Sequence, residues 1–476
     1  MASEQVQVVI IGAGLSGLCA AREVHKAGLS YVVLEAMDHV GGKILSLPVN
    51  EGGAVVDMGA AWINDTSQSE IYRLAREFGF DLVQQRTGGI NLHKDAEGEL
   101  HRIPYGKIAN LEPEQLAQIE QVLRSIAECA EKCDTNDPSK SPDAAEIDAM
   151  NVQEFIDGKF GEEASFLAPY ITRHLLGVEP CEVSALFLLD IFKRGTGLEN
   201  VLSDFKDGGQ YLRNRQGKHL LSFLHTFNHR NQAFCTRLAD QLKPGSIKVS
   251  AAVESITQSS KGCIVKASDG STCEAQKVIL SVPAGLQHTI KFDPDLPPAR
   301  KQLGQGSVFG FYSKTVLVYE EPWWHAADLS GEYSADTGPI SFARDTCVSE
   351  DGQYSITCFH AGDSGREWSR LSAEERRKTV LEDLNAAFGK VVPNVPQPIN
   401  IVEKDWLKDP WALGGPGPVL KPGILTSNAG KYMCEPFDNI YFVGTETSPV
   451  WRGYMDGAVR SGMRGGKEVV AAIKRS

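Results

Sequence analysis

The chain has 476 residues, of which 42% are hydrophobic and 23% are charged, and its formal net charge is -13. This length exceeds the usual size of one domain, so we expect two or three domains with ample hydrophobic core. The acidic balance argues against nucleic acid or an anionic membrane as the main partner, because phosphate groups are bound by clustered Lys and Arg.

The sequence also lacks the usual signals of export, anchoring and metal binding. Its first residues, MASEQ, lead directly into a predicted strand, no apolar run is long enough to cross a bilayer, and the tail does not end in SKL. The ten cysteines form no CxxC pair and no Cys/His cluster with zinc spacing. We therefore expect a cytoplasmic protein with reduced thiols, no signal peptide, no transmembrane segment and no metal site.

The first 35 residues contain a dinucleotide-binding pattern. An apolar strand over 6–11, a glycine-rich turn, a helix over 15–27 and a strand over 31–34 are followed by an acid, Glu35. Gly12 permits the tight turn, Gly14 lets the backbone approach a pyrophosphate, and Gly17 lets helix and strand pack closely. Because the pattern serves both NAD and FAD, it leaves the choice between them open.

The remaining elements follow in chain order. VGGK (40–43) and the glycine-bearing segment 52–63 predict either a loop close to a ligand or a plain turn, and helical patterns fill 81–207. Strands are predicted at 247–253, 262–267 and 277–282 and, for a second sheet, at 315–319 and 354–360. A helix over 372–388 opens with a capping box, and a strand at 440–443 precedes a helix to 473. We expect one sheet to receive both ends of the chain.

The C-terminal block favours FAD. Gly444-Thr445-Glu446 ends a strand, and 453–458 (GYMDGA) opens a helix whose N–H groups can face an electron-rich ring. With GAGLSG, VGGK and KVILSVP in this order, nearly the whole chain resembles the FAD-dependent amine oxidase family, most closely the monoamine oxidases with their soluble fungal members. The resemblance implies an α/β fold with a Rossmann-like, GR2-type FAD-binding domain (1–80, 208–290 and 400–476). An inserted α+β substrate domain of mixed sheet and helices would comprise 81–207 and 291–399.

The resemblance also implies the residues that hold FAD. Family members usually have GGR where this chain has Gly42 and Lys43, so the charge is kept but the arginine fork is lost. The implied contacts are Gly12, Gly14, Ser16 and Gly17 at the pyrophosphate, Glu35 at the ribose, Gly42 and Lys43 at the phosphate and ribityl region, Ala60, Ala61 and Trp62 along the flavin, Val253 at adenine, and Glu446 and Met455 at the ribityl chain and pyrimidine ring.

Four residues match catalytic positions of the family. Lys314 corresponds to the lysine that reaches flavin N5 through a water, although a surface lysine at the start of a strand is the alternative interpretation. Gln210 corresponds to a glutamine facing the substrate, Trp406 to a tryptophan near the flavin, and Tyr454 to one wall of an aromatic cage.

The segment Ala412 to Pro416 departs from the family. Many monoamine oxidases tether FAD through a cysteine in an SGGCY-type sequence, and the absence of a cysteine here implies noncovalent FAD. Gly415 and Pro416 also replace the aromatic partner of Tyr454. We expect a half-open cage with room for a bulky, branched or long-chain amine.

The family resemblance implies oxidative deamination, in which a primary amine, O2 and water give an aldehyde, ammonia and H2O2, with hydride passing to flavin N5. The substrate stays open. An amino-acid oxidase would need an arginine clamp, for which the candidates are Arg173, Arg194, Arg213 and Arg215, each of which can also be a solvated surface charge. The mixed to basic charge over 187–215 favours a long amine with acidic groups, such as a fumonisin-type amine, over a polyamine. Two alternatives to an amine oxidase are a desaturase-like enzyme and a non-catalytic flavin-binding scaffold. By family analogy we expect a homodimer.

Overall fold

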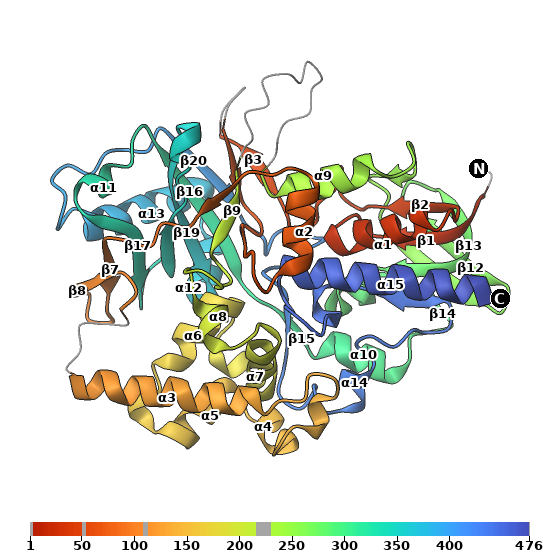
Figure 1. Ribbon diagram of the computed structural model, residues 1–476, viewed down its shortest axis with the longest axis horizontal. Helices are drawn as coiled ribbons and strands as arrows, with labels where there is room; N and C mark the ends of the chain where they lie inside the picture. Colours follow the sequence, from red (N-terminus) through yellow and green to blue (C-terminus); the bar gives the residue numbers. More distant parts are fainter. Residues whose placement is uncertain (1–2, 50–53, 108–112, 216–229, 476) are drawn as a thin grey trace.

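The computed structural model describes residues 3–49, 54–107, 113–215 and 230–475. Residues 52–53, which open the predicted glycine-bearing segment, lie outside these ranges. Two large sheets and a layer of helices dominate the described chain, with three small sheets beside them. The two ends of the described chain lie close together at one side of the molecule (Figure 1).

The first sheet has a parallel part that contains both ends of the chain. β1 (Glu4–Ile11) and β22 (Ile440–Phe442) each pair in parallel with β13 (Thr272–Leu280), and β2 (Tyr31–Leu34) pairs with β1. The prediction that one sheet receives both ends is therefore confirmed. The sheet order is β10-β2-β1-β13-β12-β11-β14, with β10 (Ile247–Lys248), β11 (Val253–Ser259), β12 (Gly262–Ala267) and β14 (Lys291–Asp293).

Two helices lie side by side against this sheet. α1 (Leu15–Lys26) and α15 (Met455–Arg475) cover the face that carries Val8 and Ile10, because side chains alternate between the faces of a strand. Their close approach depends on glycine: a Cβ on Gly462 would lie 2.2 Å from the backbone oxygen of Ser16. The N-terminal pattern and the C-terminal helix thus form one packed unit.

The second sheet has the order β20-β16-β19-β18-β17-β7-β8. Its central strands, β16 (Tyr312–Tyr319) and β19 (Tyr354–Ala361), agree with the two predicted strands. The sequence did not predict β7 (Ile90–Lys94), β8 (Leu100–Pro104), β17 (Leu329–Ala335), β18 (Phe342–Asp345) or β20 (Asn400–Lys404). β20 begins at the predicted domain boundary, and the division into two domains stays a prediction.

Six α-helices of the described chain lie after β8 and within 81–207, which agrees with the predicted helical character of that range. They are α3 (Pro113–Glu131), α4 (Ala144–Ala149), α5 (Val152–Phe160), α6 (Leu167–Leu176), α7 (Ala185–Arg194) and α8 (Leu198–Leu202), and they form the lower layer in Figure 1. α7 is almost wholly buried, so it is the core helix of this layer. No helix in the described ranges is long and apolar enough to cross a membrane.

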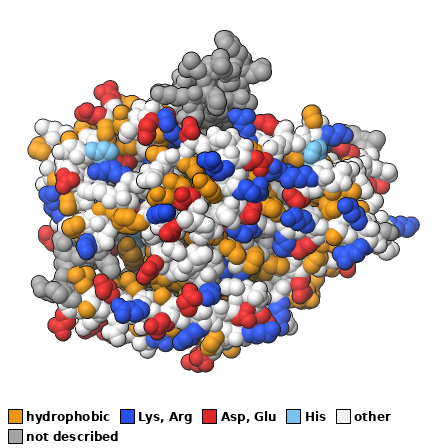
Figure 2. Space-filling model, in the orientation of Figure 1, with side chains coloured by type: hydrophobic (Ala, Val, Ile, Leu, Met, Phe, Trp, Pro, Cys, Tyr) orange, Lys and Arg blue, Asp and Glu red, His pale blue; other side chains and the backbone are white. Residues whose placement is uncertain are grey.

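The predicted capping box is confirmed: Ser372 and Glu375 bond each other's backbone N–H at the start of α13 (Ala373–Phe388). The other elements are β3 (Ser46–Pro48), β4 (Val55–Asp57), β5 (Trp62–Ile63), α2 (Ser69–Glu77), β6 (Leu82–Gln84), β9 (Leu212–Asn214), α9 (Gln232–Asp240), α10 (Pro298–Gln305), β15 (Ser307–Phe309), α11 (Trp323–Ala326), α12 (Gly362–Arg370), β21 (Pro418–Leu420) and α14 (Asn428–Lys431). Acidic and basic side chains are interspersed over the face seen in Figure 2.

Candidate active site

A cavity of about 390 Å³ collects nearly all of the predicted site residues. Its lining includes Gly12, Gly14, Ser16, Glu35, Gly42, Lys43, Ala60, Ala61, Trp62, Gln210, Val253, Lys314, Trp406, Gly415, Pro416, Glu446, Tyr454 and Met455. These residues come from both sheets and from the connecting loops. Gly17 is absent from the lining because it faces Gly12, where an added Cβ would lie 1.9 Å from the Gly12 oxygen.

The glycine-rich turn forms one end of the cavity. Gly12 has φ of +97°, which side chains rarely adopt, so the turn requires glycine there. Both carboxylate oxygens of Glu35 accept backbone N–H groups, one from Ala13 in the turn and one from Met37. Burial raises the pKa of Glu35, and these N–H groups oppose that rise. Glu35 thereby fixes the turn to the end of β2.

Lys43 has a free charge in the cavity wall. Its Nζ is buried, finds no hydrogen-bond partner among the described residues, and lies 5.2 Å from the Phe309 ring centroid. Burial lowers its pKa to about 8. Glu446 and Asp409 oppose this fall through their charge, but neither forms a hydrogen bond with Nζ, and a buried ammonium without hydrogen bonds is costly. A phosphate group in the cavity would supply a directly bound anion. The residues at this end therefore fit the diphosphate of FAD.

Lys314 lies on β16, deep in the cavity. It is 4% exposed, so it is not a surface lysine. Its Nζ donates to the backbone oxygens of Gly59 at 2.6 Å and Asp57 at 3.3 Å, and it lies 5.1 Å from the Phe359 ring centroid. Burial lowers its pKa to about 8, so the amine is still mostly protonated at pH 7.

Two further predicted residues have unused polar atoms. The Tyr454 hydroxyl and the Gln210 Oε1 are buried without a hydrogen-bond partner in the described part of the chain. Trp406 is held by its own hydrogen bond, which Nε1 donates to the Met58 oxygen at 2.9 Å. Tyr454 and Gln210 can therefore bond a molecule in the cavity, whereas Trp406 offers its ring.

Tyr312 and Phe359 also line the cavity, and sequence reasoning missed both. Tyr312 lies two residues before Lys314 on β16, so the two share a face, and this spacing was the available signal. Phe359 pairs with Lys314 across β16 and β19, a register that the sequence does not reveal. Their rings are 5.3 Å apart. Together they give aromatic surface near Gly415, where the half-open cage was expected.

The four arginines considered as carboxylate clamps do not line the cavity. Each has a partner elsewhere: Arg173 pairs with Glu179 at 2.9 Å, Arg194 with Asp190 at 2.7 Å and Arg215 with Asp351 at 2.7 Å, while Arg213 donates to the backbone oxygens of Thr346 and Cys347 at 2.9 and 2.8 Å. Arg194 and Arg213 are also buried, so they are not surface charges. The arginine in the lining is Arg452, which the sequence reading overlooked.

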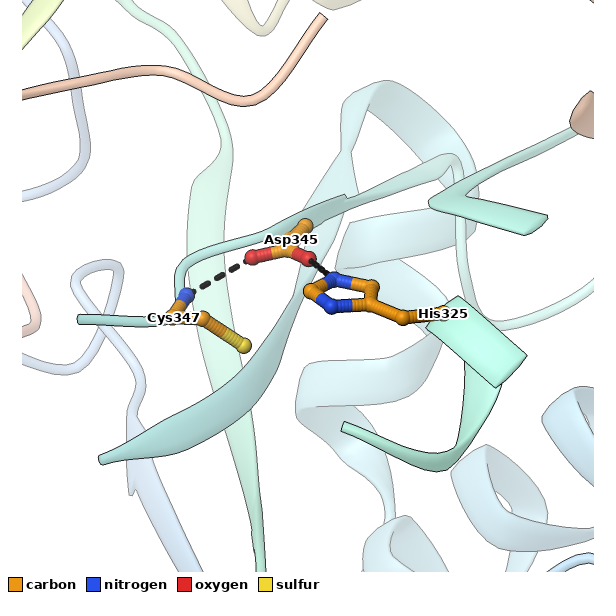
Figure 3. A group of neighbouring side chains, drawn as sticks. All are labelled: His325, Asp345 and Cys347. Atoms are coloured by element: carbon orange, nitrogen blue, oxygen red, sulfur yellow. Dashed lines mark hydrogen bonds and ion pairs between the residues drawn. The ribbon is translucent and has the colours of Figure 1, made fainter. Parts of the chain in front are cut away.

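A separate polar cluster lies on the second sheet, away from the cavity lining. Asp345 accepts hydrogen bonds from His325 Nε2 at 2.6 Å and from the Cys347 backbone N–H at 2.8 Å (Figure 3). It also accepts one from Trp324 Nε1 at 2.9 Å. Burial raises the pKa of the Cys347 thiol, which keeps it protonated. The carboxylate is thus occupied by hydrogen bonds that join α11 to β18.

The ten cysteines all have free thiols, and none belongs to the described lining of the cavity. Pro416, in the segment where many monoamine oxidases carry the tethering cysteine, lines the cavity instead. This arrangement agrees with a flavin that is bound without a covalent tether.

Comparisons with known proteins agree with this site. Residues 15–470 match the family model described as flavin containing amine oxidoreductase. The chain is 30% identical to amine oxidase [flavin-containing] B of Homo sapiens, over 99% of this chain and 87% of that protein. It superposes on putrescine oxidase bound to putrescine with a TM-score of 0.87 at 25% identity, covering 99% of this chain and 100% of that one. For cyclohexylamine oxidase from Brevibacterium oxydans the TM-score is 0.88 at 26% identity, covering 98% and 99%.

The family model spans most of the chain, and the cavity offers free groups that suit both a diphosphate and an aromatic ring system. The chain therefore belongs to the flavin-containing amine oxidase family and is a monoamine oxidase-like, FAD-dependent amine oxidase.

Proposed function

We propose that this enzyme deaminates primary amines, in particular long-chain amines, in the chamber bounded by Lys314, Tyr454 and Phe359. The observation that carries the proposal is the buried, aromatic-lined end of the cavity, in which Tyr454 and Gln210 have unused polar atoms. FAD, when bound, accepts a hydride from the α-carbon of the amine and is reoxidised by O2. The chain's own residues orient the amine, exclude water and control its protonation.

The amine must enter the chamber as a cation and react as a neutral amine. Its deprotonation costs about 4 kcal/mol at pH 7 for a pKa near 10. Burial among Trp62, Tyr312 and Phe359 disfavours the charged form, which lowers that cost. Lys314 adds a positive charge nearby and acts in the same direction. The chamber thus favours the reactive form of the substrate.

A row of aromatic rings supports a long substrate. Phe359 stacks on Phe342 at 4.4 Å, Phe342 on His174 at 4.5 Å, and His174 lies 4.4 Å from Tyr170, which is 53% exposed. Phe359 and His174 line the cavity, so the row leads from the chamber to the surface. An alkyl chain can contact Phe359 and His174, the two rings of this row that line the cavity, while its amine reacts at the inner end.

The charges at the outer end of the row favour a second cationic group. Arg344, two residues after Phe342 on β18, bonds Asp204 and lies 3.8 Å from Glu332. The Tyr105 hydroxyl lies 2.7 Å from Asp204 and 3.2 Å from Glu332. We call these four residues the mouth cluster. Two carboxylates against one guanidinium leave an excess of negative charge when both are ionised, so a diamine is a second candidate substrate class.

Amines with acidic groups, including the fumonisin-type amines, stay a prediction. The mixed to basic charge over 187–215 was the observation that favoured such groups. Arg194, Arg213 and Arg215 in this range have internal partners, and the mouth cluster is acidic in balance. Three alternatives also remain: an L-amino-acid oxidase, a desaturase-like enzyme and a non-catalytic flavin-binding scaffold. Turnover of simple amines would argue against the last two, and a comparison with amino acids tests the first.

A peroxide-coupled assay tests the proposal. The purified, yellow holoenzyme is offered straight-chain monoamines, diamines, amino acids and long-chain amino alcohols, and we expect peroxide and aldehyde from the amines. No turnover of any amine would overturn the proposal. Acid precipitation tests the absence of a tether, since flavin should stay in the supernatant. Light scattering tests the homodimer, which stays a prediction from family analogy.

A further inference from the structure

Arg452 is a buried arginine that none of the roles above uses. It lies between Trp451 and Gly453, just before α15, and is 6% exposed. Its side chain lines the cavity beside Tyr454 and Met455. Its Nη1 donates to Asp190 at 2.6 Å, whereas its Nε is buried without a partner among the described residues. One N–H donor of this guanidinium is therefore not used by the described residues.

The environment of Arg452 has an excess of positive charge. The fully buried carboxylate of Asp190 is shared with Arg194, whose Nε lies 2.7 Å from the same oxygen. Arg194 also donates to the backbone oxygens of Ser448 and Thr135 and does not line the cavity. One carboxylate thus faces two guanidiniums. The buried carboxylate of Glu446, also in the lining, attracts Arg452 but is shared with Lys43 and Arg300, so positive charge remains in excess around Arg452. Burial lowers the Arg452 pKa to about 10, so it remains charged at neutral pH.

The position of Arg452 indicates which anion it serves. Arg452 lies three residues before Met455, expected at the pyrimidine ring, and both residues line the cavity. Hydride transfer breaks the α-C–H bond of the amine, which becomes an iminium cation. The two electrons and one proton that arrive leave the flavin ring with one negative charge. A fixed, dehydrated cation beside the ring stabilises that charge without reorganisation.

We propose that Arg452 holds a positive charge beside the pyrimidine side of the flavin and raises its midpoint potential. Asp190 keeps the guanidinium in place, and the sharing of Asp190 with Arg194 leaves the charge incompletely neutralised. The inference depends on FAD in the cavity and not on which amine is oxidised.

The test compares two arginines that share one carboxylate. Arg452→Met and Arg194→Met are purified as holoenzymes, and each midpoint potential is measured by dye equilibration, with sulfite titration as a second probe. We expect Arg452→Met to lower the potential and to weaken sulfite binding tenfold or more. Arg194→Met leaves Asp190 to Arg452 alone, so it should shift both in the same direction by a clearly smaller amount. Equal shifts in both variants, or no shift in Arg452→Met, would overturn the proposal.

Two further variants keep the test decisive if Arg452→Met does not retain flavin. Arg452→Gln keeps an N–H donor but no charge and should show the lowered potential. Arg452→Lys keeps the charge and should recover most of the wild-type potential and sulfite affinity. A normal potential in Arg452→Gln, or a lowered potential in Arg452→Lys that matches Arg452→Gln, would assign Arg452 a packing role and overturn the proposal.

Discussion

The two ends of the cavity are built in different ways. At the nucleotide end, Gly12, Gly17 and Glu35 lie within one short βαβ unit. The two glycines act through the backbone, and the Glu35 carboxylate accepts backbone N–H groups of the same unit. At the amine end, Lys314, Phe359 and Tyr454 come from distant segments and act through side chains. The nucleotide end is therefore a local structure with little tolerance for change. The second end depends on tertiary packing and can vary without loss of the fold.

The largest expected effect is at the nucleotide end. Gly17→Ala places a Cβ 1.9 Å from the Gly12 oxygen, which is backbone and cannot rotate away. We expect loss of bound flavin and a free energy of unfolding lower by about 3 kcal/mol. Visible absorbance and urea unfolding measure both. The control, Gly158→Ala in α5, has open space at its Cβ and should be as stable as the wild type or slightly more so. Retained flavin in Gly17→Ala would refute the local account of this end.

At the amine end, Lys314→Met should leave the fold and bound flavin intact. Lys314 contributes a buried charge, and removal of one such group slows the assisted step on the order of a hundredfold. We expect this loss in the reaction of reduced enzyme with O2, measured by stopped flow, and a much smaller loss in amine oxidation. In the wild type the rate with O2 should fall as pH rises through about 8, because the lysine then loses its proton. Equal slowing of both half-reactions would contradict this role.

The difference between local structure at the nucleotide end and tertiary packing at the amine end also explains which features the sequence could predict. The βαβ unit, the capping box at Ser372 and the return of β22 to the first sheet follow from local patterns, and these predictions are confirmed. Strands β7, β8, β17, β18 and β20 are short and carry polar side chains, so their pairing comes from sheet context rather than from local periodicity. Phe359 and Arg452 enter the cavity only through strand register and helix packing, which no local pattern records.

A smaller effect is expected at the mouth cluster. If Glu332 binds a second ammonium group, Glu332→Gln should raise KM for a diamine about tenfold and leave KM for the matched monoamine unchanged. Burial and Asp204 raise the Glu332 pKa to about 7, while Arg344 and Tyr105 act in the opposite direction and the more distant Asp345 adds to the rise. The wild-type preference for the diamine should therefore weaken as pH falls through about 7. The control, Glu182→Gln, should keep the wild-type preference, because Glu182 pairs with Arg366 outside the mouth cluster. If Glu332→Gln also kept that preference, the diamine proposal would be wrong, although amine oxidation itself would be unaffected.

The smallest effect is expected for Arg173, which lies outside the cavity lining and pairs with the Glu179 carboxylate at 2.9 Å. Because Arg173 does not line the cavity, Arg173→Met should change the KM for amines and for amino acids by less than about threefold. Loss of the partly exposed ion pair should lower the free energy of unfolding by about 1 kcal/mol or less. Initial rates over both substrate classes measure this. If Arg173→Met selectively abolished turnover of an amino acid, a carboxylate clamp would act at the amine end from outside the described cavity. In that case the amine end would depend on charges of α6 as well as on the side chains that line the cavity.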